Sequence, residues 1–155
     1  MKLTFKQRLF LYISIAFALF ALSVFLFEQT REKRIKSEAI EEKLGAYADI
    51  VNESIAKKNP DQYILILDNL STLFPANLRL TIINRNGKVL YDNSILGWSK
   101  LENHLGRPEI ANSIKNRNGT DIRHSLSTGK EYLYFAKNEG DYFVRVALPN
   151  DVQVQ

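Results

Sequence analysis

Residues 78–91 read LRLTIINRNGKVLY, and this stretch decides how the C-terminal part of the chain folds. Leu78–Ile83 is an apolar segment of strand length that contains β-branched residues. The dipeptide Asn86-Gly87 is the strongest short signal for a β-hairpin, because a type I′ turn requires positive φ at both central residues. Lys88–Tyr91 is therefore predicted to return antiparallel to the first strand.

Three more strands are predicted after this hairpin, separated by turns at Gly129 and Gly140. Such short connections join antiparallel neighbours. Before these strands, Asp92–Asn103 is predicted to be a loop. A short helix then starts at Arg107-Pro108, with proline in its first turn, and ends at Asn118-Gly119. The three strands are predicted over residues 121–126, 131–137 and 142–148.

Two helices are predicted before the hairpin. The first spans residues 28–58, and its apolar residues recur at the period of one helix face; they are Ile40, Leu44, Tyr47, Val51 and Ile55. The second follows Pro60, covers residues 63–74 and is ended by Pro75. Helices that precede an antiparallel sheet and cover one of its faces give an α+β domain, here with a five-stranded sheet.

Leu9–Phe27 reads LFLYISIAFALFALSVFLF, nineteen residues without a charge, a glycine or a proline. As an α-helix this segment rises about 28 Å, close to the roughly 30 Å hydrocarbon core of a bilayer. It is longer than the apolar region of a cleaved secretory signal, which has about 7–15 residues. A core helix of a soluble domain rarely lacks polar residues on every face. The segment is therefore predicted to be an uncleaved transmembrane signal anchor.

The flanks of this span favour an orientation with residues 28–155 outside the cytoplasm. Residues 1–8 form a short tail with three basic and no acidic residues, as in a signal-anchor n-region. The other flank also holds Lys and Arg, so a count alone does not separate the two sides. Its basic residues alternate with Glu28 and Glu32 on a continuing helix. We expect the inner (cytoplasmic) membrane, with residues 28–155 periplasmic.

The charge balance does not favour a nucleic-acid-binding protein. The chain has 21 Lys and Arg against 17 Asp and Glu, but three of the basic residues belong to the tail before the span. The remainder is nearly neutral, and no zinc-finger spacing or RNA-binding aromatic motif is present. The chain has no cysteine, which excludes disulfides and thiolate metal sites. Residues 59–155 are enough for one small domain with its own core.

Two segments carry a resemblance to a known family. TIINRNGKVLYDN, residues 81–93, contains a strand, an Asn-Gly turn and a strand that ends in Asp. NHLGRPEIANSIKNRNGTDIRHSLSTGKEYLYFAKN, residues 103–138, contains an Arg-Pro-Glu helix start, a Gly-ended helix and two strands. Their order and spacing resemble the extracytoplasmic PAS-like (PDC-type) sensor domain of bacterial membrane-bound sensor histidine kinases, close to the phosphate-regulon type. The resemblance extends over Leu78–Pro149 and includes no catalytic motif.

The resemblance implies the sensory input module of a two-component system, which detects an extracytoplasmic signal and passes it through the membrane helix. The parent protein is expected to be an autophosphorylating histidine kinase, with a second membrane helix and the kinase region after Gln155. Neither His104 nor His124 lies in a phospho-acceptor helix, and no catalytic residue is predicted in this chain. A homodimer through the membrane and long helices is expected.

Strand alternation places polar residues on one face of the predicted sheet. In the implied fold this face is the ligand cavity, and two guanidinium groups with phenolic hydroxyls suit a small anion such as a carboxylate. The alternative is that the arginines pair with neighbouring acids, Glu109 and Asp121 among them, and close a sheet face without a pocket. The candidate ligand-binding residues are Asp92, Arg107, Arg123, Ser125, Tyr132, Tyr134 and Arg145.

Other classes are less well supported by the residues. A pilin-like structural subunit shares the order of helix and sheet, but Lys2–Lys6 lacks the glycine of its cleavage site and Leu9–Phe27 lacks its glutamate. A membrane-anchored binding protein without a kinase stays open. An anchored enzyme would need a nucleophile arrangement, paired acids or a phosphate loop, and none is visible. No cofactor and no metal site are predicted.

The expected organisation is a cytoplasmic tail, a transmembrane signal anchor, a long amphipathic helix and an extracytoplasmic sensor domain, over residues 1–8, 9–27, 28–58 and 59–155. The expected partners are the lipid bilayer, a second copy of the chain, and a small anionic ligand or a periplasmic partner protein.

Overall fold

The computed structural model describes residues 4–95, 97, 101–124 and 129–150. These residues form a mixed α+β structure, as the sequence predicts. The elements in chain order are α1 (Phe5–Ile55), α2 (Pro60–Ser71), β1 (Arg79–Asn84), β2 (Val89–Asp92), α3 (Pro108–Asn116), β3 (Asn118–His124), β4 (Glu131–Asn138) and β5 (Tyr142–Pro149). The chain divides into two compact units, residues 1–36 and 37–155. The C-terminal part of α1, residues 37–55, therefore belongs to the unit that contains the sheet; it is called the second half of α1 below.

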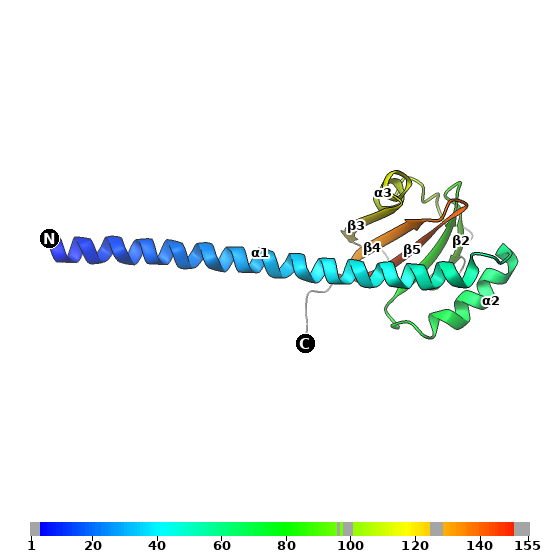
Figure 1. Cartoon of the computed structure of the whole chain (residues 1–155), viewed down its shortest axis with the longest axis horizontal. Helices are drawn as coiled ribbons and strands as arrows, with labels where there is room; N and C mark the ends of the chain where they lie inside the picture. Colours follow the sequence, from blue (N-terminus) through cyan, green and yellow to red (C-terminus); the bar gives the residue numbers. More distant parts are fainter. Residues whose placement is uncertain (1–3, 96, 98–100, 125–128, 151–155) are drawn as a thin grey trace. The chain divides into compact units, whose positions relative to one another are not determined.

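The five strands form one open antiparallel sheet in the order β2-β1-β5-β4-β3 (Figure 1). This confirms the predicted five-stranded antiparallel sheet. β5, the last of the five strands in sequence, lies between β1 and β4 and pairs with both. Because β1 and β5 lie side by side, residues far apart in sequence meet on both faces.

The first hairpin forms where it is predicted, but the predicted type I′ turn is wrong. Gly87 has φ +84°, whereas Arg117 is the one non-glycine residue with positive φ in the described part of the chain. The Gly87 amide donates to the Asn84 carbonyl at 2.9 Å, and the Asn84 amide donates to the Lys88 carbonyl at 2.8 Å. This is the pattern of a three-residue loop with glycine in the left-handed region. The Asn84 side chain stabilises it by accepting from two backbone amides, at 3.0 and 2.9 Å.

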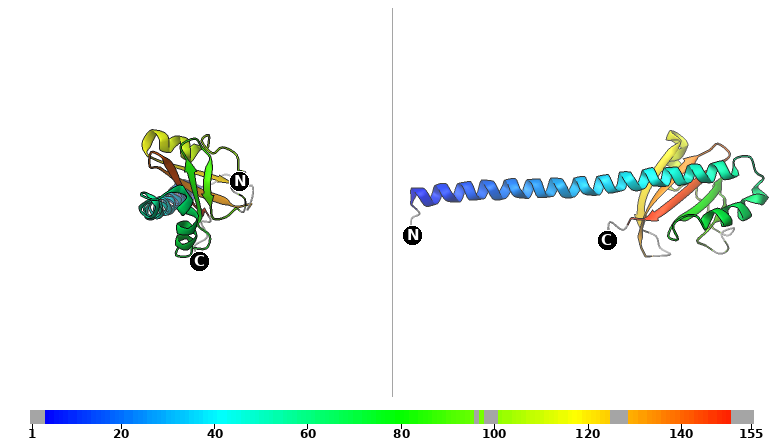
Figure 2. Two further views of the ribbon diagram at one scale, coloured as in Figure 1. Left: turned by 90° about the vertical axis from the view of Figure 1, so that its right-hand side faces the viewer. Right: turned by 60° about the horizontal axis from the view of Figure 1, so that its bottom comes forward.

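One face of the sheet is covered by the second half of α1 and by α2, as two views show (Figures 1 and 2). The fully buried residues of α1 recur at helical spacing; they are Leu44, Ala48, Val51 and Ile55. Their main partners in the sheet are Leu80, Ile82, Leu133, Phe135, Val144 and Val146. Full burial of such a side chain stabilises the fold by about 1.5–3 kcal/mol. The predicted helical stripe is confirmed, with Ile40 and Tyr47 partly buried at its margin.

Polar contacts fix α1 on the sheet in addition to this core. The Tyr142 hydroxyl donates to Asn52 Oδ1 at 2.6 Å, and Lys137 forms an ion pair with Asp49. Both contacts join α1 to the strands β4 and β5. They lie beside the buried stripe and restrict sliding of the helix along the sheet.

Several element boundaries differ from the predicted ones. α2 begins at Pro60 and ends at Ser71, whereas the predicted bounds are residues 63 and 74. Its C-terminal end is earlier because the Leu73 amide donates to the Leu70 carbonyl, which forms a tighter turn in place of the last predicted helical turn. α3 ends at Asn116, and Arg117 takes φ +69° to reverse the chain. β3 therefore begins at Asn118, three residues earlier than predicted. The predicted residues 125 and 126 of this strand lie outside the described residues.

Gly119 does not end the helix as predicted, but brings β3 close to α3. A Cβ at this position would lie 2.1 Å from the Glu109 carbonyl oxygen and 2.6 Å from the Ser113 amide nitrogen. Only glycine permits this distance between the two backbones. This close approach fixes the position of Glu109, which lies in the first turn of α3 and is buried.

Within the described residues, one helix is long and apolar enough to cross a membrane. It is α1, whose most apolar stretch has a mean hydropathy of 2.5, with none of that stretch buried. The apolar side chains of residues 9–27 are thus left without a protein partner in the described chain.

Two leucines of α2 provide a test of this packing. Leu67 is fully buried, whereas Leu65 is 71% exposed. We expect Leu67→Ala to lower the free energy of unfolding by about 2–5 kcal/mol, because it removes packed methyl groups and leaves a cavity. Leu65→Ala should change it by less than about 0.5 kcal/mol. Urea unfolding of the full chain in micelles, followed by circular dichroism, measures both; equal losses would contradict the assigned faces of α2.

Candidate functional site

The second face of the sheet carries the polar residues that the sequence analysis singles out. Cross-strand pairing aligns Asp92 with Thr81, Thr81 with Arg145, and Arg145 with Ala136. These residues lie in one row across four strands. A small second core, made of Ile83, Val89, Ile110, Ala136 and Phe143, lies on the same face and includes a residue of α3.

Asp92 is the acceptor at the β2 end of this row. Its Oδ2 accepts from Arg79 Nη2 at 3.0 Å, Arg79 Nε at 3.2 Å and the Thr81 hydroxyl at 3.0 Å. Its Oδ1 accepts from the amide and hydroxyl of Ser94, at 2.9 and 2.7 Å. Burial by itself raises the pKa of Asp92, but Arg79 and Ser94 together hold that pKa below its ordinary value. Asp92 is therefore an ionised, fully satisfied carboxylate.

Arg145 lies in the middle of the row and is 2% exposed. Its guanidinium donates to the Thr81 hydroxyl at 3.1 Å and to Glu109 Oε1 at 3.3 Å. Asp92 Oδ2 is 4.0 Å away. Burial lowers the pKa of Arg145 to about 10, with the Glu109 carboxylate acting in the opposite direction. The side chain stays protonated at neutral pH.

Glu109 joins the helix α3 to this network. It is fully buried, and its Oε1 accepts from Arg123 Nη2 at 2.8 Å as well as from Arg145. Its Oε2 is also buried and has no hydrogen-bond donor among the described residues. The Arg123 guanidinium lies 4.3 Å from the centre of the Tyr134 ring, a cation–π distance. One carboxylate thus binds two arginines that approach from different strands.

The structure therefore brings together four of the seven candidate ligand-binding residues: Asp92, Arg123, Tyr134 and Arg145. They contact one another or Glu109, Thr81 and Arg79. This arrangement corresponds to the alternative in which the arginines pair with neighbouring acids. Binding of a small anion by these residues stays a prediction.

Of the other three candidate residues, Arg107 and Tyr132 make no side-chain hydrogen bond to this network. Arg107 precedes α3 and is partly exposed. Its carbonyl accepts from the Ala111 amide at 2.9 Å, and its guanidinium makes no hydrogen bond or ion pair within the described part of the chain. Tyr132 is partly buried, and its ring centre is 6.1 Å from that of Tyr134. Ser125 lies outside the described residues.

Sequence reasoning missed Arg79 as a site residue. Arg79 alternates with Leu80 along β1 and therefore shares the polar face with Thr81. The same alternation that identified Arg123 and Arg145 would have identified it. Glu109 was named only as a pairing partner, because its position in the first turn of a helix does not reveal which way its side chain points.

A cavity of about 250 Å³ lies beside the Arg79–Asp92 ion pair. It is lined by Ala76, Asn77, Leu78, Arg79, Ser94, Ile95 and Tyr132. Its polar groups are a guanidinium, an amide, a hydroxyl and a phenol, which suit a small molecule with acceptor oxygens. In the described part of the chain, no group of three His, Cys, Asp or Glu side chains is placed to hold a metal ion.

His104 is buried beside the same network, with 5% of its surface exposed. Burial lowers the pKa of His104 to about 4, and the nearby charges of Arg145, Arg107 and Arg79 act in the same direction. The imidazole is therefore neutral at pH 7. Its Nδ1 has no hydrogen-bond partner among the described residues, and its backbone amide donates to the Gly87 carbonyl at 2.9 Å.

This burial makes the stability of the domain dependent on pH. In the unfolded chain His104 becomes protonated below about pH 6.5, whereas in the folded chain it does so only near pH 4. The free energy of unfolding therefore decreases as the pH is lowered from about 6.5 to 4. We expect His104→Gln to make the decline of unfolding free energy between pH 6.5 and 4 less steep. His124 is exposed, so His124→Gln is the matched control and should leave the slope unchanged. Urea unfolding at a series of pH values measures both, and equal slopes in wild type and His104→Gln would contradict the burial of a neutral imidazole.

Comparisons with known proteins bear on the fold. No protein-family model matches the chain, and no curated protein matches it. Among solved structures, it is similar to the Bacillus subtilis YkuI protein, which has an EAL domain and was crystallised with its substrate c-di-GMP and calcium, at a TM-score of 0.52 and 14% identity. The match covers 96% of this chain and 40% of that one. At this level of identity the likeness shows a shared fold alone.

Proposed function

We propose that this chain is the sensory input module of a membrane-bound two-component sensor histidine kinase. The observation that carries the proposal is the continuity of α1. One uninterrupted helix, Phe5–Ile55, contains both the apolar segment and the residues packed on the sheet. The apolar segment and the residues that pack on the sheet are therefore parts of the same helix.

The arrangement of the sheet-bearing unit supports a PAS-like identity. Helices cover one face of a five-stranded antiparallel sheet, and α3 contributes Glu109 and Ile110 to the other face. The sequence resemblance implies the same arrangement, with the long helix on the apolar face and the short helix over the polar face. The polar face is the input side of the proposal, and the face beneath α1 is the output side.

The central strands connect these two sides. In β5, Arg145 points to the polar network, whereas its neighbours Val144 and Val146 pack against the helix side. Tyr142 of the same strand binds Asn52 of α1. A stimulus shifts such a system only if it binds two packings of α1 with different affinity.

A small anion is the ligand that the polar face would bind best. Among the described residues that line the cavity beside β1, Arg79 is the one with a charge, and part of its side chain is exposed. An anion there would compete with Asp92 for the guanidinium and loosen the part of the row that connects Asp92 with Arg145. A periplasmic partner protein is the other input that fits the same module.

A homodimer through the long helix is part of the proposal. On α1, Ala39 and Ala46 are exposed and lie one heptad apart, whereas Ala48 is fully buried against the sheet. Small residues at heptad spacing allow close approach of a second helix. The pilin-like and kinase-free binding-protein alternatives do not require such pairing.

The proposed orientation predicts the outcome of reporter fusions. Alkaline phosphatase fused after Asn150 should be active, because residues 28–155 lie outside the cytoplasm, and green fluorescent protein at the same position should be dark. Neutralising Lys2, Lys6 and Arg8 together should reduce the phosphatase activity, because these residues hold the tail inside. A bright fluorescent fusion with an inactive phosphatase would contradict an extracytoplasmic sensor.

The absence of native cysteine makes single-cysteine cross-linking a clean test of the dimer. In membranes, Ala39→Cys and Ala46→Cys should form disulfide-linked dimers under mild oxidation, and Ala48→Cys should not, because its side chain faces the sheet. Anions that occupy the cavity should change the yield at residues 39 and 46. Equal yields at all three positions, or none at any, would contradict the proposed pairing of α1.

A further inference from the structure

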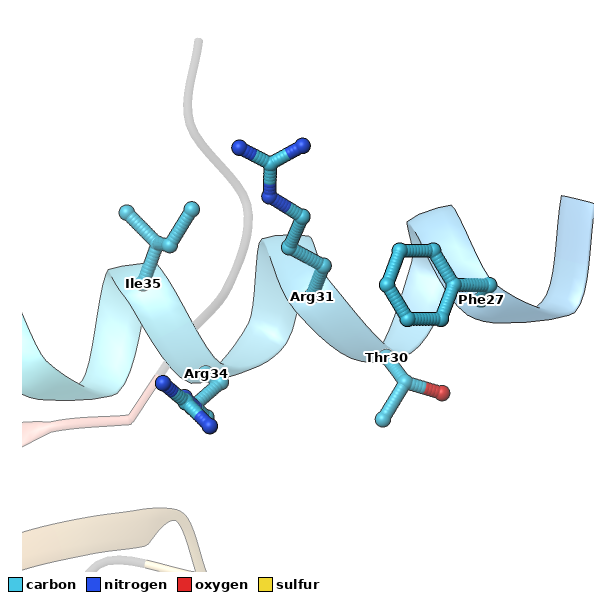
Figure 3. A pocket seen from close by; sticks show the side chains of 5 residues that line it. All are labelled: Phe27, Thr30, Arg31, Arg34 and Ile35. Atoms are coloured by element: carbon cyan, nitrogen blue, oxygen red, sulfur yellow. The ribbon is translucent and has the colours of Figure 1, made fainter. Parts of the chain in front are cut away.

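A basic segment follows the apolar part of α1 directly. Residues 28–36 contain four Lys and Arg and two Glu within the same helix. Phe27, which ends the apolar run, is 68% exposed, and Ile35 is 52% exposed. Phe27, Thr30, Arg31, Arg34 and Ile35 line one surface hollow, and Figure 3 shows Arg31 and Arg34 extending from different sides of the helix.

The spacing places Arg31 at the depth of lipid phosphates. Arg31 follows Phe27 by four residues, or about 6 Å along the helix axis. The headgroup layer on each side of the hydrocarbon core is about 5–7 Å thick. Side chains on a helix also lean towards its N-terminus, so those that follow the span lean back towards the bilayer.

Internal contacts in this segment leave the Arg31 guanidinium available. The Glu32 carboxylate forms an ion pair with Lys36 at 2.5 Å, and this contact lowers the pKa of Glu32. The Thr30 hydroxyl donates to the Leu26 carbonyl at 2.9 Å. The Arg31 side chain has no hydrogen bond or ion pair with any other described residue, and its backbone belongs to α1. A guanidinium is suited to phosphate because it donates two parallel hydrogen bonds.

We propose that Arg31 binds the phosphate of an anionic phospholipid in the leaflet at the C-terminal end of the membrane span. Lys33 and Arg34 add positive charge within the next turn of the helix, and Phe27 packs against the acyl chains next to the headgroups. The bound headgroup fixes the depth of the apolar segment of α1 in the bilayer. The inference rests on the membrane insertion that the proposed function requires.

The test uses the full chain in bilayers with equal amounts of phosphatidylglycerol and phosphatidylcholine of matched acyl chains. Native mass spectrometry after extraction counts the lipids of each class that stay bound. Wild type should retain phosphatidylglycerol in excess of its share of the bilayer. Arg31→Gln should lower the ratio of bound phosphatidylglycerol to phosphatidylcholine about fivefold, which corresponds to about 1 kcal/mol for one basic residue near an anionic surface.

Two further variants separate this site from a general effect of charge. Arg31→Lys keeps the charge but cannot donate two parallel hydrogen bonds, so it should lose part of the preference, whereas Lys57→Gln, an equal charge change to that of Arg31→Gln at an exposed position of the sheet-bearing unit, should have no effect. A wild-type ratio in Arg31→Gln, or an equal loss in Lys57→Gln, would overturn the proposal.

Carbonate extraction of the same membranes distinguishes this failure from failure of the proposed function. A chain released by carbonate would overturn both proposals, since neither holds without a membrane span. A chain that stays in the membrane but shows no preference for phosphatidylglycerol would overturn the lipid site alone.

Discussion

The packing of the second half of α1 on the sheet is the contact on which the rest of the structure depends. Four residues of this helix, Leu44, Ala48, Val51 and Ile55, are fully buried. Without them much of one apolar face of the five-stranded sheet would be open to water, because α2 covers only part of it. The helix that covers the core is also the helix that contains the apolar segment, residues 9–27.

The opposite face follows a different physical rule. Burial of Arg145 in a central strand has a large desolvation cost, and that cost is offset only because Glu109, Thr81 and Asp92 surround the guanidinium. Removing one member would leave a buried charge uncompensated, which makes the network sensitive to anything that competes for its groups. The proposed sensory role requires this property, because the polar face must be stable in one arrangement and still respond to a ligand or partner that offers new contacts. Arg79 lines the cavity beside β1 and is therefore where the proposed competition would begin.

The two faces together suggest how the proposed module divides its tasks. Strand β5 alternates between them, with Arg145 on the polar side and Val144 and Val146 on the helix side. A lipid headgroup held by Arg31 would add a fixed point at the membrane end of α1. Movement originating in the sheet would then act on a helix whose depth is set by the bilayer.

The local features of the fold were determined by the sequence itself. The apolar segment, the helical stripe, the first hairpin and the alternation of the later strands are all periodic patterns, and such patterns depend on neighbours a few residues away. They predicted the α+β class, the five strands and the face on which Arg123, Tyr134 and Arg145 lie. The same alternation contained Arg79, although it was not identified as a site residue.

Tertiary structure alone decided which of these groups meet. The pairing of β1 with β5 brings Thr81 to Arg145, the close approach at Gly119 positions Glu109, and the loop before α3 buries His104 among arginines. It also decided the first turn, where the Asn84 side chain favours a three-residue loop over the two-residue turn that Asn86-Gly87 indicates. The physical reason is that charges and backbones from distant segments interact only after the core has brought the strands together, and local periodicity carries no information about that distance.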